Sequence, residues 1–289
     1  MFLQCGAFKL SLERPLVMGV VNVTPDSFSD GGLHASTEQA VAHARRLAAE
    51  GADILDIGGE STRPGAQAVG LDEERRRVLP VLVALAGCGV PLSVDTRKPE
   101  LMTEAFAAGA AMVNDVTALR APAALAAVAR STVAVCLMHM QGEPRTMQEN
   151  PTYRDVVHEV RDFLAQRVAA VERAGVARDR IVVDPGFGFG KTVEHNLALL
   201  RALGEFRSLG VALMAGLSRK AMLGKLTGRE PRERIHGSVA AALLAAQNGA
   251  QIVRVHDVAA TRDALAVWQA VKTGTRRQGA KAANKSIQE

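Results

Sequence analysis

The sequence predicts a single α/β domain folded as a (β/α)8 barrel, the TIM barrel architecture. The first observation is a rhythm: short apolar segments rich in β-branched residues alternate with segments of helical period, and each pair occupies roughly 30 residues, the size of a βα unit. The second is that the apolar segments are continuous, which is typical of parallel strands covered on both faces. Eight such units over about 250 residues match one barrel. An open doubly wound sheet is the alternative, but it usually has fewer strands.

Local signals place each strand and several helices. The predicted strands cover residues 17–23, 54–57, 91–95, 111–114, 133–138, 181–184, 211–215 and 252–255. Ser36, Thr37 and Glu38 are typical of a helix start, and Gly51 is a stop signal before the second strand. A further helix starts at Pro99 and stops at Gly109, and three more are expected over 153–174, 192–206 and 231–248.

The composition excludes several classes of protein. With 48% hydrophobic residues among 289, the chain can bury a core and is not disordered. Only 3% are aromatic, so Ala, Val, Leu and Ile must build the interior. Three cysteines are too few for a disulfide scaffold. No apolar segment has the length of an export signal or a membrane span, so we expect no membrane association and a cytoplasmic location.

The basic charge is concentrated at the C-terminal end. Residues 272–289 carry +4 of the net charge of +5. They contain Lys272, Arg276, Arg277, Lys281, Lys285 and, with the opposite sign, Glu289. We predict a barrel over residues 1–271 followed by a solvated, poorly ordered tail. The tail lacks the aromatic residues of a strand-binding surface, so no nucleic-acid binding is expected.

Polar residues stand at the C-terminal ends of the predicted strands, in segments that are otherwise apolar. They are Asn22, Asp56, Asp95, Asn114, His139, Asp184, Ser218, Arg219, Lys220, Arg254 and His256. One such aspartate alone would be interpreted as a helix cap. Their coincidence on all eight strands predicts a composite site on the C-terminal face, where barrel enzymes build their active sites.

The cationic members of this set predict a ligand that carries phosphate. Arg63, Lys220, Arg254 and His256 are cations or hydrogen-bond donors, and the last two lie two residues apart on a strand and so point the same way. The loops after the seventh and eighth strands are the usual phosphate-binding place in barrels. The helix start after Ser218 also offers free N–H groups to an anion.

A second group is predicted deeper and on the other side of the site. Asp95, Asn114 and Asp184 suit a flat heterocycle with adjacent N–H donors, since a carboxylate can accept two parallel hydrogen bonds. The spacing typical of a transition-metal site is missing, so no metal held by protein ligands alone is expected. The sequence is compatible with magnesium shared with ligand phosphates and reached by Asn22.

The glycine-rich stretch 184–192 does not match a phosphate-binding loop. The Walker pattern requires glycine where Pro185 stands, and the dinucleotide pattern requires glycine where Lys191 stands. We interpret the stretch as a loop whose backbone lies against a planar ligand, with Phe187 or Phe189 as an apolar wall.

From residue 18 to residue 258 the chain closely resembles the dihydropteroate synthase family, through long motifs in the order found in the family. They are MGVVNVTPDSFSDGG (18–32), DIGGESTRPGA (56–66), SVDTRKP (93–99), NDV (114–116), CLMHMQGEPRTMQ (136–148), DPGFGFGKT (184–192), GLSRK (216–220) and RVHDV (254–258). The resemblance implies a transferase of folate biosynthesis that joins 6-hydroxymethyl-7,8-dihydropterin pyrophosphate to p-aminobenzoate, giving dihydropteroate and pyrophosphate. It also implies bound Mg2+ and a homodimer formed through helices on the outside of the barrel.

The resemblance further implies individual roles. The pterin would be held by Asp95, Asn114, Asp184 and Lys220, with Met138, Phe189 and Gly216 as walls. The pyrophosphate would be held by Asn22, Arg63, Arg254 and His256, with Asn22 also on magnesium. The p-aminobenzoate residues would be Phe28, Thr62, Pro64, Ser218 and Arg219, and the catalytic residues Asp30, Arg63, Asp95 and Lys220. Phe28 and Pro64 match positions that the family associates with sulfonamide sensitivity.

One departure concerns the p-aminobenzoate carboxylate. Many members of the family have serine at the position of Ala221, so here the carboxylate would depend on Ser218 or on helix N–H groups.

Three other functions compete with this interpretation. A pterin-binding methyltransferase barrel, acting between methyltetrahydrofolate and a corrinoid, would share the carboxylates and the amide but would not need Arg63 and Arg254 around a pyrophosphate. A Schiff-base aldolase would use Lys220 as the nucleophile. A protein that binds RNA through its basic tail is the non-enzymatic alternative.

Overall fold

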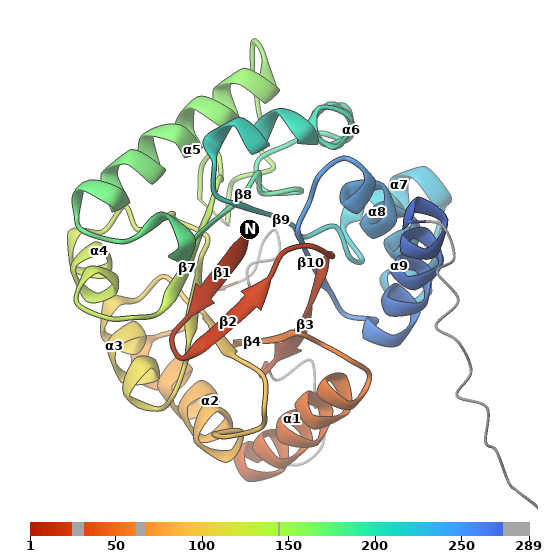
Figure 1. Ribbon diagram of the computed structural model, residues 1–289. Helices are drawn as coiled ribbons and strands as arrows, with labels where there is room; N and C mark the ends of the chain where they lie inside the picture. Colours follow the sequence, from red (N-terminus) through yellow and green to blue (C-terminus); the bar gives the residue numbers. More distant parts are fainter. Residues whose placement is uncertain (25–31, 62–66, 144, 274–289) are drawn as a thin grey trace, which may run out of the picture.

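The computed structural model describes residues 1–24, 32–61, 67–143 and 145–273, and at its centre is a closed barrel of parallel strands (Figure 1). The strands are β3 (Leu16–Asn22), β4 (Ile54–Gly58), β5 (Leu92–Asp95), β6 (Met112–Asp115), β7 (Ala134–Met138), β8 (Ile181–Asp184), β9 (Ala212–Ala215) and β10 (Ile252–Val255). Each strand pairs with the next along the chain, and β10 closes the barrel by pairing with β3. The predicted (β/α)8 architecture is confirmed.

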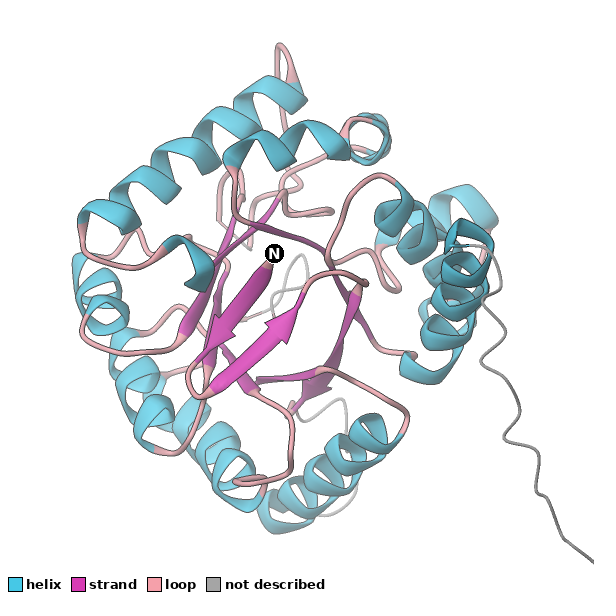
Figure 2. Ribbon diagram, in the orientation of Figure 1, coloured by secondary structure: helices cyan, strands magenta, loops and turns pink. Residues whose placement is uncertain are grey.

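The helices form a ring around the barrel (Figure 2). They are α1 (Gly32–Ala49), α2 (Leu71–Ala84), α3 (Pro99–Ala107), α4 (Pro122–Ala129), α5 (Val156–Arg173), α6 (Val193–Arg201), α7 (Ala221–Thr227), α8 (Ile235–Gln247) and α9 (Val258–Thr273). The largest apolar cluster lies between their inner faces and the outward side chains of the strands. Strands such as β4 and β7 are buried at every position, which explains their continuous apolar sequences.

Several helix boundaries differ from the sequence-based expectation. Helix α1 begins at Gly32, one turn before the predicted start at Ser36. The helix expected over 192–206 divides into α6 and the 3-10 helix Leu203–Leu209, with Gly204 just after the break. The helix expected over 231–248 likewise becomes a 3-10 turn at Pro231–Glu233 followed by α8. The start predicted at Pro99 is confirmed, since proline occupies the first position of α3 and needs no N–H partner there.

An antiparallel hairpin of β1 (Phe2–Cys5) and β2 (Phe8–Ser11), which the sequence analysis did not predict, lies across one end of the barrel (Figure 1). Leu3 and Cys5 are fully buried and pack on the interior residues of the barrel strands, among them Met112 and Met214. The interior is therefore filled by methionine, cysteine and aliphatic side chains, and the hairpin closes it at the N-terminal ends of the strands.

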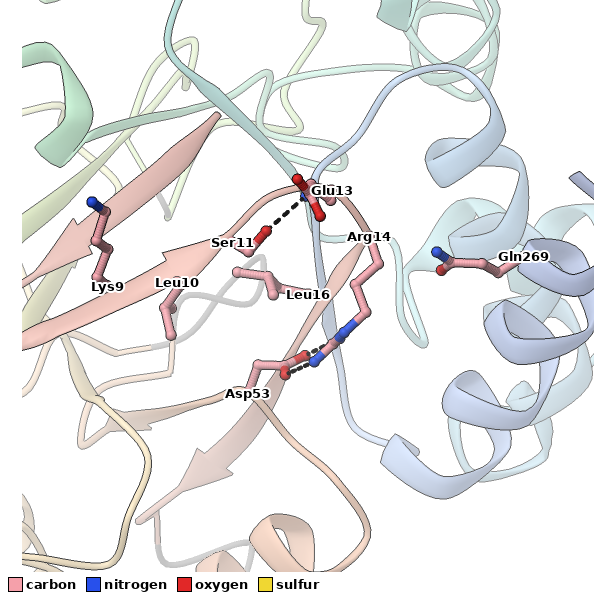
Figure 3. Close-up of a pocket in the computed structure, with 8 residues that line it drawn as sticks. All are labelled: Lys9, Leu10, Ser11, Glu13, Arg14, Leu16, Asp53 and Gln269. Carbon is pink, nitrogen blue, oxygen red and sulfur yellow. Dashed lines mark hydrogen bonds and ion pairs between the residues drawn. The ribbon is translucent and has the colours of Figure 1, made fainter. Parts of the chain in front are cut away.

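A surface cavity of about 400 Å³ lies at this same end of the barrel (Figure 3). Lys9, Leu10, Ser11, Glu13, Arg14, Leu16, Asp53 and Gln269 line it. The Arg14 Nη2 atom lies 2.6 Å from Asp53 Oδ1, and Arg262 Nη2 lies 2.9 Å from the same oxygen. These ion pairs connect the chain after β2 to β4 and α9.

The last helix extends slightly beyond the predicted end of the barrel. Helix α9 continues to Thr273, so Lys272 belongs to the helix, where its Nζ lies 5.0 Å from the centroid of the Trp268 ring. The rest of the predicted tail, residues 274–289, lies outside the described residues. Within the described ranges, no helix is long and apolar enough to cross a membrane.

Candidate active site at the C-terminal end of the barrel

The register of the sheet places three predicted site residues in one layer. Asn22 pairs with Gly58, Gly58 with Asp95, and Asp95 with Asn114, each on the neighbouring strand. All four are at or next to the last residue of a strand, so they lie at the C-terminal mouth of the barrel, opposite the hairpin. The prediction that polar strand ends assemble on one face is confirmed for these residues.

Arg254 is the centre of the polar network in this mouth. Its Nε donates to Asp56 Oδ2 at 2.6 Å, and its Nη2 donates to Asp95 Oδ2 at 2.8 Å. Asn114 Nδ2 donates to the same Asp56 oxygen at 3.1 Å. Residues from four strands are thereby joined in one hydrogen-bonded group.

This network corrects one prediction. The cationic group and the carboxylate group were expected on different sides of the site, but Arg254 is in direct contact with Asp95. The reason is electrostatic: a carboxylate in the barrel mouth needs a charged partner, and Arg254 of β10 supplies one at hydrogen-bonding distance.

The charges of the network do not balance. Burial raises the pKa of Asp95 to about 7, which Arg254 opposes and the charges of Asp56 and Glu74 reinforce. For Arg254, burial alone would lower the pKa, but Asp56 and Asp95 more than offset this and raise it. Two carboxylates therefore share one permanently charged guanidinium, and Asp95 is the group that can take up a proton near neutral pH.

Several polar atoms at this level of the barrel are buried without a hydrogen-bond partner. They are Asp56 Oδ1, Ser93 Oγ and Asn114 Oδ1, on three consecutive strands, and Asp56 is paired in register with Ser93. Buried polar atoms are rarely left unpaired in native proteins. Their presence here indicates that a polar ligand or water completes the group.

Asp184 lies at the end of β8 and faces the same space. Its Oδ1 accepts from Gly186 N at 2.7 Å, and burial raises its pKa, although the Gly186 N–H and Lys220 oppose the shift. A Cβ atom built on Gly216 would lie 3.7 Å from Asp184 Oδ2 and 3.8 Å from Arg254 Cβ. Asp184 and Arg254 thus both border Gly216, where a side chain would contact the two of them.

An apolar wall borders these carboxylates. Met138 and Phe189 belong to one small buried cluster with Val116, Met140 and Met147. Lys220 Nζ lies 4.1 Å from the centroid of the Phe189 ring, a cation–π contact. Met138 pairs in register with Asp184, so the wall and the carboxylate come from adjacent strands. The structure therefore brings all seven predicted pterin residues to one region.

The predicted pyrophosphate and p-aminobenzoate residues meet through His256. Its Nδ1 lies 3.0 Å from Ser218 Oγ, and its backbone N–H donates to the same oxygen at 3.2 Å. Arg219 has its guanidinium 2.6 Å from Asp257 Oδ1. A contact of Arg219 with p-aminobenzoate stays a prediction, as do the roles of Phe28, Asp30, Thr62, Arg63 and Pro64, which lie outside the described residues.

Two residues of the site were not assigned a role from the sequence. Asp56 was recognised only as a polar residue at the end of a strand. An ionisable residue inside an apolar strand is visible in the sequence, but the residues with which it pairs are not. Lys191 was considered only as part of a phosphate-loop pattern that fails. Lys191 is 3% exposed, and its side chain contacts His139, another polar residue noted after the fifth strand.

Comparison with known proteins identifies the class of barrel to which this site belongs. Residues 18–256 match the family described as "Pterin binding enzyme". The chain is 54% identical over 275 residues to the dihydropteroate synthase of Neisseria meningitidis serogroup B, covering 93% of this chain and 96% of that protein.

Solved structures agree with the sequence comparison. The Xanthomonas albilineans dihydropteroate synthase with 4-aminobenzoic acid superposes with a TM-score of 0.90 and 59% identity, covering 95% of this chain and 99% of that one. The Burkholderia cenocepacia dihydropteroate synthase complexed with 7,8-dihydropteroate gives 0.87 and 54%, with 94% and 96% covered. The chain is a pterin-binding enzyme of the TIM barrel fold. More narrowly, it belongs to the dihydropteroate synthase family of transferases, which make dihydropteroate.

Proposed function

We propose that the mouth of the barrel binds the pterin ring on Asp95, Asn114, Asp184 and Lys220 and condenses its pyrophosphate ester with p-aminobenzoate. The observation that carries this proposal is the gathering of two carboxylates, Asp95 on Arg254 and Asp184 across Gly216 from it, in the barrel mouth that also holds the unpaired Asn114 Oδ1. A pterin offers a flat ring whose edge carries adjacent N–H donors, which match these acceptors. Met138 and Phe189 provide the apolar surface that such a ring requires.

In the reaction, the pterin CH2–O bond breaks and its electron pair stays on the pyrophosphate oxygen. The nitrogen of p-aminobenzoate forms the new bond to the CH2 carbon and then loses a proton to solvent. We propose that ionisation of the CH2–O bond precedes capture of the amine. Asp95 and Asp184 favour positive charge developing on the ring, while Arg254 and His256 stabilise the leaving oxygens. The amine is already a nucleophile, so no strong base is needed.

We propose magnesium as the counter-ion of the pyrophosphate. Asn22 supplies a neutral oxygen at the end of β3. In the part of the chain described, no group of three acidic, His or Cys side chains could hold a metal, so the ion would depend on the substrate for most of its ligands. Magnesium usually keeps several waters and binds substrate phosphates in addition to one or two protein ligands. When bound, the ion would neutralise charge on the leaving group.

We also propose a homodimer formed through the outer helices. Leu244 on α8 and Val267 and Val271 on α9 are exposed large apolar side chains on helices that contact one another. Exposed apolar side chains on neighbouring helices are compatible with an interface. Sedimentation analysis would distinguish a dimer from a monomer. The cytoplasmic location stays a prediction from the sequence.

The proposed reaction is tested by incubating the enzyme with the pterin pyrophosphate, with and without p-aminobenzoate and magnesium. We expect dihydropteroate and pyrophosphate in equal amounts when all components are present, and strongly reduced turnover after chelation of magnesium. A parallel incubation with methyltetrahydrofolate and a corrinoid examines the methyltransferase alternative. Methyl transfer without dihydropteroate formation would reverse the assignment.

A further inference from the structure

We propose that Lys191 is a positioning residue, whose buried ammonium group holds the segment 184–190 in the conformation that presents Asp184 and Phe189 to the pterin ring. This inference rests on the pterin site proposed above. It assigns a role to a residue that belongs neither to the predicted site nor to a phosphate-binding motif.

The contacts of Lys191 Nζ all connect it to two loops of the site. It donates to Gly186 O and to Phe189 O, each at 2.9 Å, and lies 3.0 Å from His139 Nδ1. The first two acceptors belong to the loop after β8, and His139 belongs to the loop after β7. One ammonium group therefore bonds to three acceptors, two backbone carbonyls of one loop and an imidazole nitrogen of the other.

The geometry of the loop after β8 depends on such a fixed point. Gly186, Gly188 and Gly190 all have left-handed φ values, between +62° and +79°, so the segment gains no support from regular secondary structure. A Cβ atom on Gly186 would overlap the carbonyl oxygen of His139, so the two loops are in direct backbone contact. The Gly186 N–H in turn donates to Asp184 Oδ1. Lys191 thus holds Gly186, the residue whose N–H donates to one of the pterin carboxylates.

The same ammonium group fixes the position of the aromatic wall. Phe189 O accepts from Lys191, and Phe189 N donates to Gly186 O at 3.1 Å. The Phe189 ring lies beneath Lys220 Nζ. Loss of Lys191 would therefore disturb Asp184, Phe189 and Lys220 together, although Lys191 itself is buried among the two loops.

The electrostatic surroundings of Lys191 agree with a role inside the protein. Burial lowers its pKa to about 7, with Asp184 opposing and Lys220 reinforcing the shift. Burial and the charge of Lys191 lower the pKa of His139 to about 3, so the imidazole is neutral and can accept the hydrogen bond. A buried cation is costly unless it is fully hydrogen-bonded. The three hydrogen bonds of Lys191 offset this cost, and an apolar side chain at the same position could not hold the three acceptors in place.

The test replaces Lys191 by methionine, which keeps the side-chain length and removes the donors, and by glutamine, which keeps a shorter donor. The probe is 6-hydroxymethylpterin, whose dissociation constant is measured by calorimetry. We expect an increase of about tenfold for Lys191→Met and a smaller increase for Lys191→Gln. Hydrogen exchange of residues 184–190 should accelerate in both variants.

Arg180→Met is the matched control. Arg180 also donates to backbone carbonyls, with its Nε 2.9 Å from Val133 O, but it precedes β8 at the opposite end of the barrel. We expect it to lower the free energy of unfolding without changing the affinity for pterin. This control separates a positioning role from a general loss of stability.

The outcomes distinguish the two proposals. If the wild-type enzyme does not bind the pterin, the proposed function fails. If the wild type binds and a folded Lys191 variant binds equally well with unchanged exchange, the role of Lys191 is overturned. Should Lys191→Met not fold, Lys191→Gln must still show weakened binding, and unchanged binding in that variant would likewise overturn the role.

Discussion

Arg254 divides its guanidinium group between Asp56 and Asp95, so one positive charge is shared by two carboxylates. The consequence falls on Asp95, whose pKa is raised from 3.8 to about 7, first by burial and further by the charge of Asp56. Only the ionised carboxylate accepts N–H donors on both of its oxygens. Asp95 must therefore be deprotonated to hold a pterin edge, and its pKa sets the pH range in which it can do so.

The first prediction concerns the pH dependence of pterin binding. We expect affinity for 6-hydroxymethylpterin to weaken as the pH falls through about 7, since Asp95 becomes protonated. In Asp56→Asn the midpoint of this pH dependence should move to lower pH. A neighbouring negative charge is then removed, and Arg254 no longer shares its charge between two carboxylates. Calorimetric titrations between about pH 5 and about pH 9 measure the midpoint, and the ligand carries no phosphate that titrates in this range.

Asp53→Asn is the control for this experiment. Asp53 is also a carboxylate paired with arginines, but it lies at the other end of the barrel beside Arg14 and Arg262. We expect its midpoint to equal that of the wild type. A midpoint that stays in place or rises in Asp56→Asn would contradict the proposed coupling of Asp56 to Asp95.

At the scale of elements, the loop after β8 acts as a rigid support, and its glycines allow this to be measured. Gly186 and Gly228 have almost the same left-handed φ, +71° and +70°. They differ in their surroundings: a Cβ on Gly186 would overlap the His139 carbonyl, whereas a Cβ on Gly228 would have nothing within 4 Å. Comparing alanine substitutions at these two glycines therefore separates the effect of backbone strain from the effect of losing the contact between the two loops.

We expect Gly228→Ala to lower the free energy of unfolding by about 1–2 kcal/mol, the cost of a left-handed residue with a Cβ atom, and to leave pterin binding unchanged. Gly186→Ala should lower it further and weaken pterin binding, since the loop must move away from His139. Urea denaturation and calorimetry provide the two measurements. Equal losses of stability with normal binding in both variants would mean that the loop does not support the site.

Some strands and helices could be predicted from the sequence and others could not. Strands such as β4 and β8 were predicted because burial on both faces produces a continuous apolar run that is visible locally. The hairpin of β1 and β2 was missed because its burial depends on the open end of a barrel formed later in the chain. The start of α1 was misplaced because the Ser and Thr that favour a cap also occur inside helices.

For the site too, features that depend on contacts between distant segments could not be predicted from the sequence. The ends of the strands could be assigned to one face from topology alone, so Asp95, Asn114 and Asp184 were placed correctly. The pairing of Arg254 with Asp56 joins residues 198 positions apart, and the local sequence contains no sign of it. The role of Lys191 was hidden for a similar reason, since its partner His139 belongs to a different βα unit.

At the scale of the whole molecule, stability and chemistry lie at opposite ends of one barrel. The hairpin fills the N-terminal end with Leu3 and Cys5, both fully buried among interior residues of the strands. The polar network occupies the C-terminal end, where several buried polar atoms still lack partners. In barrels generally, residues at the N-terminal end serve stability and those at the C-terminal end serve catalysis.

This separation of the two ends predicts different effects when a large buried apolar side chain is replaced by alanine at one end or at the other. Leu3→Ala should lower the free energy of unfolding by about 3 kcal/mol, because it removes buried methyl groups and leaves a cavity in the barrel interior. The affinity for pterin and the turnover should stay near the wild-type values at a temperature where the variant is folded.

Phe189→Ala also removes a buried side chain, but from the mouth of the barrel, where its ring lies under Lys220. It should weaken pterin binding strongly whatever its cost in stability. Urea denaturation and pterin titration of both variants compare the two ends directly. Weakened pterin binding in folded Leu3→Ala would show that the interior transmits changes along the barrel, and the separation of the two ends would then be wrong.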